Sequence, residues 1–164
     1  MEFRLLDRIT EIEPGVRIRA TKTLSGDEQY LKDHFPLFPV MPGVLMLEAM
    51  FQASMWLLRR TDEFRHAVVT LNEARNIKYA DFIQPGQTLV VTSEIFKQEG
   101  DLFTFKAQGT VGDQVAVSAR LILERAHIKD KLPQRAASDP YTRKKMKQFF
   151  DELYQPAPTA ETLV

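Results

Sequence analysis

The chain has 164 residues, of which 44% are hydrophobic, and its 22 basic side chains balance 22 acidic ones. This composition predicts one soluble domain with an ordinary packed core, and the charge balance favours neither nucleic acid nor an acidic surface as a partner. The absence of cysteine excludes disulfides, thiolate nucleophiles and cysteine-based zinc sites. Charges within residues 1–8 argue against a signal peptide, and prolines in the longest uncharged run argue against a membrane span. We therefore expect a cytoplasmic protein.

The first part of the chain predicts two strands, a rigid loop and a long helix. Alternation of apolar and polar residues indicates antiparallel strands near 3–12 and 16–23. Prolines then exclude a helix or a central strand over 36–42, because each removes a backbone donor and fixes its own φ. Pro42 suits a first helical turn, and the apolar run after it predicts a buried helix. This helix should end before residues 61–63, which we expect at the surface.

Four further strands are predicted after this helix, because period-two runs alternate with turn signals rich in Gly and Asp. They are expected at about 67–78, 88–98, 102–111 and 114–125. One long apolar helix followed by consecutive strands favours the α+β class, with an antiparallel sheet curled over the helix.

The last part of the chain differs in composition, since basic residues predominate there. We divide the chain into a domain of residues 1–126 and a basic extension of residues 127–164. A helix is predicted from Pro140 to Tyr154, with Asp139 as its N-cap. Helical spacing gathers four apolar side chains on one side of this helix, namely Met146, Phe149, Phe150 and Leu153.

Glu48 is the only ionisable side chain from Phe35 to Leu58. A lone carboxyl on an apolar helix needs a partner, a cavity or a neighbouring subunit, because burying it bare costs several kcal/mol. The segment could build an acid/base site. His34 can act as a base, Glu48 can act as an acid, and the Gly43 N–H could polarise a carbonyl. Each residue also has a purely structural explanation. His34 could be a hydrogen-bonding partner, Glu48 could form a structural ion pair, and Gly43 could serve the turn that starts the helix.

Other kinds of site find no support in the sequence. It contains no Gly-rich phosphate loop, no His/Glu pair at metal-binding helical spacing and no Gly-x-Ser-x-Gly turn. We therefore predict no metal site, and an acid/base site remains.

One segment resembles the signature of the FabZ/FabA-type 3-hydroxyacyl-acyl-carrier-protein dehydratases, and the glutamate at position 48 makes it more similar to the FabZ branch. The resemblance covers about residues 1–126. It implies a hot-dog fold, in which the sheet wraps the long helix and two subunits pair into a homodimer, commonly three dimers to a hexamer. The matching residues are His34-Phe35-Pro36, Pro39, Pro42-Gly43-Val44-Leu45, Glu48-Ala49-Met50 and Gln52.

The resemblance also implies roles for these residues. His34 of one subunit would take the α-proton of a (3R)-3-hydroxyacyl thioester, Glu48 of the other would protonate the departing hydroxyl, and the Gly43 N–H would hold the thioester oxygen. A trans-2-enoyl thioester would remain. Gln52 and Val40 are carried over as supporting residues. No cofactor is implied, because the acyl chain arrives on the phosphopantetheine arm of acyl carrier protein.

Four residues depart from the family pattern, and three functions compete with dehydration. The bulky Leu37, Phe38 and Phe51 lie near the expected tunnel and predict an altered acyl-chain preference, while Asp33 puts a carboxylate beside the base.

The basic extension either packs on the body with a solvated basic face or binds the acidic carrier protein. The competing functions are a hot-dog acyl thioesterase, a hot-dog enoyl hydratase and a non-catalytic acyl-thioester binding protein.

Overall fold

The computed structural model describes residues 3–156 and residue 158. Six antiparallel strands form one sheet in the order β1-β2-β4-β5-β6-β3, which confirms the predicted α+β class. The first strand starts later than expected, at Arg8. Leu5 and Leu6 are buried and the Leu5 N–H donates to Gln52 of the long helix, while the Asp7 N–H donates to the Thr21 carbonyl at 2.8 Å. The strands are β1 (Arg8–Glu13), β2 (Arg17–Thr23), β3 (Val68–Tyr79), β4 (Thr88–Glu99), β5 (Leu102–Val111) and β6 (Gln114–Ala126).

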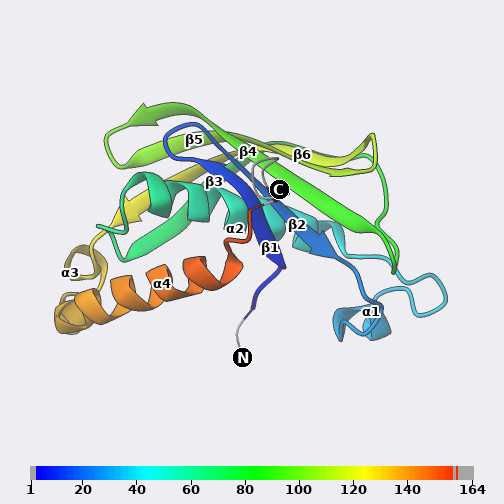
Figure 1. Cartoon of the computed structure of the whole chain (residues 1–164), viewed down its shortest axis with the longest axis horizontal. Coiled ribbons are helices and arrows are strands. Elements are labelled where there is room, and N and C mark those ends of the chain that lie inside the picture. Colours follow the sequence, from blue (N-terminus) through cyan, green and yellow to red (C-terminus); the bar gives the residue numbers. More distant parts are fainter. Residues whose placement is uncertain (1–2, 157, 159–164) are drawn as a thin grey trace.

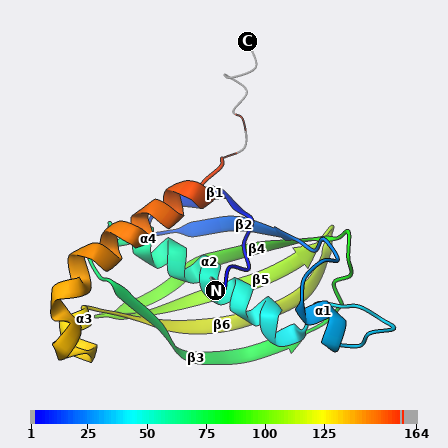
Figure 2. The same ribbon diagram turned by 90° about the horizontal axis from the view of Figure 1, so that it is seen from below.

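The sheet curls over one long helix, α2 (Gly43–Thr61), as predicted, and a second long helix, α4 (Asp139–Leu153), lies on the side of α2 away from the sheet (Figure 1). Figure 2 shows α2 running obliquely beneath the strands with α4 beside it. The short elements are α1 (Tyr30–Asp33), α3 (Ile128–Lys131) and the 3-10 helix η1 (Pro133–Ser138). No helix within the described ranges has the length and apolar character needed to cross a membrane.

The core lies between α2 and the sheet, where apolar side chains of both are fully buried. One polar contact joins the two layers: the hydroxyls of Ser54 on α2 and Ser93 on β4 are 2.7 Å apart, and neither residue is exposed. Ser54 also donates to the carbonyl of Met50, 2.8 Å away. The pair therefore satisfies its own polar groups and fixes the position of α2 against β4.

Gly109 on β5 allows close packing at the centre of the sheet. A Cβ atom there would lie 2.7 Å from Leu89 Cδ1 and 2.9 Å from Val117 Cγ1, and both neighbours are fully buried. We predict that Gly109→Ala lowers the free energy of unfolding by about 1–3 kcal/mol, because the neighbours have no space to move into. Denaturant unfolding measures this change. Gln108→Ala, at the exposed adjacent position, should change it by less than about 0.5 kcal/mol.

The C-terminal helix is confirmed, and its apolar side packs onto the body of the protein. Phe150 and Leu153 are buried, and Met146 and Phe149 are half-buried against the core. The helix starts at Asp139, whose carboxylate does not cap it as predicted. It accepts instead from the backbone N–H of Ile128, at 3.1 Å, because the chain folds back from α3 at this point.

The two edges of the sheet differ. The edge of β1 is partly covered after α4, where Tyr154 forms a parallel bridge with Ile9 and the Gln155 N–H donates to the Ile9 carbonyl at 3.0 Å. Within residues 3–156, the outer edge of β3 pairs with no other strand. A long uncovered edge is a site for pairing with another chain.

Candidate active site

His34 follows α1 directly, and its backbone N–H donates to the Tyr30 carbonyl at 3.2 Å. The side chain is half-buried, with its ring centroid 4.4 Å from that of Phe35. Phe35 has a φ of +51°, a left-handed conformation that is uncommon for a bulky residue. The surrounding fold must offset this backbone strain, which concentrates at functional positions in proteins. The strain therefore marks the turn beside His34 as a candidate functional position.

A tight turn follows, in which the Phe38 N–H donates to the Phe35 carbonyl at 2.8 Å. Pro36 occupies the second position of this turn, where its fixed φ is favourable. The turn leaves Leu37 fully exposed, at 101%, and brings the Phe38 ring edge-on to Phe82 with centroids 5.9 Å apart. These apolar side chains thus form part of the surface of a single chain.

The N-terminus of α2 presents an unpaired donor. Pro42 is the N-cap, and its carbonyl accepts from the N–H groups of Leu45 and Met46 at 2.9 and 3.3 Å. The Gly43 N–H has no hydrogen-bond partner among the residues that the structure describes. A Cβ atom on Gly43 would lie 3.0 Å from the Tyr79 ring, so glycine permits this close approach. Such an N–H, at the positive end of the helix dipole, can stabilise a developing oxyanion.

Val40, the other predicted supporting residue, is buried just before this helix, at 1% exposure. The next residue, Met41, donates its N–H to the Ile83 carbonyl at 2.9 Å. The loop is therefore fixed to the segment between β3 and β4 immediately before α2 begins.

Glu48 lies one turn into α2 and is hydrogen-bonded to Gln52. Gln52 Nε2 donates to Glu48 Oε1 at 3.2 Å and to the Phe3 carbonyl at 3.0 Å, and Gln52 Oε1 accepts from the Leu5 N–H at 2.9 Å. These contacts hold the buried Gln52 amide in one orientation. The amide in turn orients the carboxyl of Glu48.

Glu48 opens onto a cavity of about 340 Å³, which lies between α2 and α4. The spacing of three and four residues gathers one stripe of α2 side chains along this cavity. The α2 residues that line it are Glu48, Phe51, Gln52, Met55, Trp56 and Arg59.

A single chain brings only some of the predicted site residues together. Glu48, Gln52 and Phe51 share the cavity, whereas His34, Leu37 and Phe38 are not among the residues that line it. The fold is therefore compatible with a base supplied by a second subunit, and the roles of all these residues stay predictions. Asp33, beside His34, is exposed at the end of α1.

Arg59 is a residue of this cavity that sequence reasoning missed. It is buried, at 6% exposure, and Nη1 donates to the carbonyls of His66 and Ala67 at 3.3 and 3.0 Å. Burial lowers the pKa of Arg59 to about 10, an effect that the nearby Asp62 carboxylate opposes. Arg59 is thus protonated at neutral pH. Its spacing from Glu48 and Gln52 places Arg59 on the same side of the helix, and this spacing could have identified it from the sequence.

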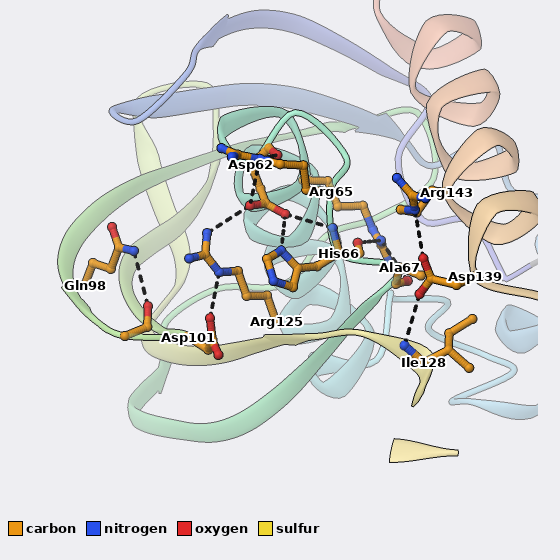
Figure 3. A network of polar contacts seen from close by, with 12 residues as sticks. Asp62, Arg65, His66, Ala67, Gln98, Asp101, Arg125, Ile128, Asp139 and Arg143 are labelled. Atoms are coloured by element: carbon orange, nitrogen blue, oxygen red, sulfur yellow. Dashed lines mark hydrogen bonds and ion pairs between the residues drawn. The ribbon is translucent and has the colours of Figure 1, made fainter. Parts of the chain in front are cut away.

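The prediction that residues 61–63 return to the surface is wrong for Asp62, which is 3% exposed. Its carboxylate accepts hydrogen bonds from Arg125 Nη1 at 2.9 Å and from the His66 N–H at 3.0 Å. It also contacts His66 Nδ1 at 2.6 Å (Figure 3). Arg125 Nε also donates to Asp101 at 3.0 Å. Buried charges need such partners. His66 lies only four positions after Asp62, whereas Arg125 lies 63 positions ahead. They fix the end of α2 to β6.

Comparison with known proteins identifies the relatives of this chain. Residues 1–120 match the model of a FabA-like domain. The chain is 35% identical over 127 residues to the 3-hydroxyacyl-[acyl-carrier-protein] dehydratase FabZ of Levilactobacillus brevis, an alignment that covers 77% of this chain and 86% of the relative. It is 36% identical over 124 residues to the enzyme of the same name from Ralstonia nicotianae, covering 72% and 74%.

Solved structures share the fold at low sequence identity. The dehydratase heterocomplex ApeI:P from Xenorhabdus doucetiae matches with a TM-score of 0.64 and 21% identity, over 80% of this chain and 88% of that one. The PaaI protein of the E. coli phenylacetic acid degradation operon matches with a TM-score of 0.57 and 12% identity, over 72% and 78%. These matches confirm the expected hot-dog fold. The family match and the curated relatives together show that the chain belongs to the FabA-like family, with FabZ dehydratases among its relatives.

Proposed function

We propose that this protein dehydrates a 3-hydroxyacyl thioester on acyl carrier protein to the trans-2-enoyl thioester, in fatty-acid or related acyl-chain biosynthesis in the cytoplasm. The observation that carries the proposal is the similarity to proteins named FabZ dehydratases, at 33–36% identity, within the family match over residues 1–120. That match includes both His34 and Glu48. The Glu48 carboxyl, held by Gln52 at a largely apolar cavity, supports the same chemistry.

The proposed reaction uses groups of the protein alone, without a cofactor. His34 takes the proton from the α-carbon while the Gly43 N–H stabilises the negative charge that develops on the thioester oxygen. The electron pair then forms the carbon–carbon double bond as the bond to the 3-hydroxyl breaks. Glu48 gives its proton to that hydroxyl, which leaves as water. Proton exchange with solvent returns His34 and Glu48 to their starting states.

The proposal includes a homodimer whose site combines His34 of one subunit with Glu48 of the other. Support comes from the edge of β3, which is twelve residues long and, within residues 3–156, pairs with no strand on its outer side. Leu71, Ile77 and Tyr79 on this strand are exposed apolar or aromatic side chains. Pairing two β3 edges would bury them. The dimer could assemble further into a hexamer, as a trimer of dimers. Measuring the mass of the protein in solution distinguishes the dimer from the hexamer.

Acyl carrier protein is the proposed partner. Lys144, Lys145 and Lys147 are exposed on α4, so the helix that packs on the body also presents a basic surface. Attraction between this surface and an acidic carrier protein would speed encounter. Both interpretations of the extension are therefore compatible, and carrier binding stays a prediction.

Incubation of the wild-type protein with a 3-hydroxyacyl-carrier-protein thioester tests the proposal. We predict a trans-2-enoyl thioester, and the reverse hydration when the enoyl thioester is supplied, because a dehydratase catalyses both directions. Mass spectrometry of the carrier protein separates the outcomes: loss of one water supports dehydration, whereas release of the free carrier protein and a 3-hydroxy acid would indicate a thioesterase. Tight binding with no change of mass would indicate a non-catalytic binding protein.

A further inference from the structure

The cavity beside Glu48 has a roof that lies partly outside the FabA-like match. That match ends at residue 120, and the roof comes largely from α4, at residues 139–153. Figures 1 and 2 show α4 beside α2, on the side away from the sheet. The roof residues are Phe3, Arg4 and Leu6 of the N-terminal segment with Met146, Phe149 and Leu153 of α4.

The floor of the cavity runs along α2 from Glu48 to Arg59. These residues are eleven positions apart, which corresponds to about 16 Å along a helix. Between them the floor includes Phe51, Met55 and Trp56. A cavity of about 340 Å³ falls within the range of small-molecule sites. Most of the side chains that line it are apolar, which suits a hydrocarbon chain whose polar end lies at Glu48.

Several contacts hold the roof in place. The Arg4 guanidinium lies over the Phe149 ring at 4.3 Å and pairs with Glu152 at 3.1 Å. The Phe150 ring packs against Trp56, with centroids 6.2 Å apart. These contacts therefore join α4 both to the N-terminal segment and to α2.

Arg59 limits the cavity at the end away from Glu48. Its guanidinium is committed to two backbone carbonyls of the loop after α2. A hydrocarbon chain offers no hydrogen bond that could replace these contacts, so moving Arg59 aside would leave buried polar groups unpaired. An acyl chain longer than the floor of the cavity would therefore meet the fixed guanidinium of Arg59.

We infer that this cavity binds the distal part of an unbranched, medium-length acyl chain, and that α4 and Arg59 set the length accepted. The inference rests on the proposed function, because it takes Glu48 as the place where the reacting end of the chain lies. It adds a specificity determinant from the C-terminal extension to that site.

The single tryptophan of the chain, Trp56, lines this cavity and reports on its occupant. Pantetheine analogues that carry a dodecanoyl or butanoyl group through an amide nitrogen in place of the thioester sulfur, each brominated at the terminal carbon, serve as non-reacting probes, because bromine quenches tryptophan emission on contact. We expect the dodecanoyl probe to quench Trp56 and the butanoyl probe to leave it unchanged. Equal quenching by both, or none by either, overturns the inference. Since no turnover is needed, this result is independent of whether dehydration occurs.

A cavity-filling variant provides the kinetic test. Met55→Phe should lower the ratio of kcat/KM for 3-hydroxydodecanoyl over 3-hydroxybutanoyl carrier protein by about tenfold, as expected when a pocket loses room for part of its ligand. Tyr141→Ala, on α4 but outside the cavity, should leave this ratio unchanged. An unchanged ratio in Met55→Phe contradicts the inference while leaving the dehydration itself in place. The thermal midpoint of each variant controls for folding.

Discussion

Glu48→Gln is expected to lower kcat/KM for dehydration of a 3-hydroxyacyl-carrier-protein thioester by about 10²–10⁴-fold, the range for loss of a general acid. Glutamine keeps the size of the side chain and an oxygen that can accept from Gln52, but it has no acidic proton to give to the leaving hydroxyl. His34→Ala is expected to cause a loss in the same range, because the base is removed. Formation of the enoyl thioester, followed by mass spectrometry, measures both variants.

A mixture of the two inactive variants tests the proposed sharing of the site between subunits. In a mixed dimer, the Glu48→Gln subunit supplies His34 and the His34→Ala subunit supplies Glu48, so one of its two sites is intact. Co-expression should restore about one quarter of the wild-type rate, because half of the dimers are mixed and each has half of its sites. If the site instead lies within one subunit, every site in the mixture lacks one group and no rate returns.

A carboxyl outside the site provides the control for these measurements. Glu94 on β4 is exposed and does not line the cavity of Glu48, so Glu94→Gln should retain the wild-type rate. Equal rates for Glu48→Gln and Glu94→Gln would remove Glu48 from the proposed mechanism.

Asp62→Ala is expected to lower the free energy of unfolding by about 3 kcal/mol, the lower part of the range for breaking a buried ion pair. The Asp62 side chain is 2% exposed, and its removal leaves Arg125 and the His66 N–H without their buried acceptor. Arg125 is itself 21% exposed and retains Asp101, so water and that carboxylate offset part of the loss. Denaturant unfolding, monitored by circular dichroism, measures the change.

Asp101→Ala is the matched control, because Asp101 contacts the same arginine from an exposed position. An exposed ion pair contributes about 0–1 kcal/mol, so this variant should lose far less stability than Asp62→Ala. Equal losses from the two variants would mean that burial of the Asp62 carboxylate does not determine the strength of this network.

The main elements of the fold could be predicted because their signals are local. Period-two alternation marked the strands, and Pro42 followed by an apolar run marked the start of α2. The segment of Leu5 and Leu6 was assigned to a strand because apolar residues at a chain end carry no sign of their partner. In the structure both are buried, and the Leu5 N–H binds Gln52, forty-seven positions away.

The site could be predicted only in part for the same reason. The resemblance carried by the loop and helix pointed to His34, Gly43, Glu48 and Gln52. It contained no information on α4, which lies beyond the matched residues and forms the roof of the cavity. Asp62 and Arg59 were missed because their burial depends on partners supplied by the following loop and by β6. Neither the backbone carbonyls seven and eight positions after Arg59 nor Arg125, 63 positions after Asp62, leave a periodic pattern in the sequence.

The unequal edges of the sheet determine how far strand pairing between chains can extend. An open sheet with two bare edges can add copies at both ends and polymerise into a fibre. Here Tyr154 and Gln155 occupy part of the β1 edge, so that end offers a poor template for another strand. Self-pairing of β3 would use the remaining edge of both copies at once. Strand addition would then stop at two chains. By covering part of the β1 edge, the short segment after α4 would reduce aggregation through that edge.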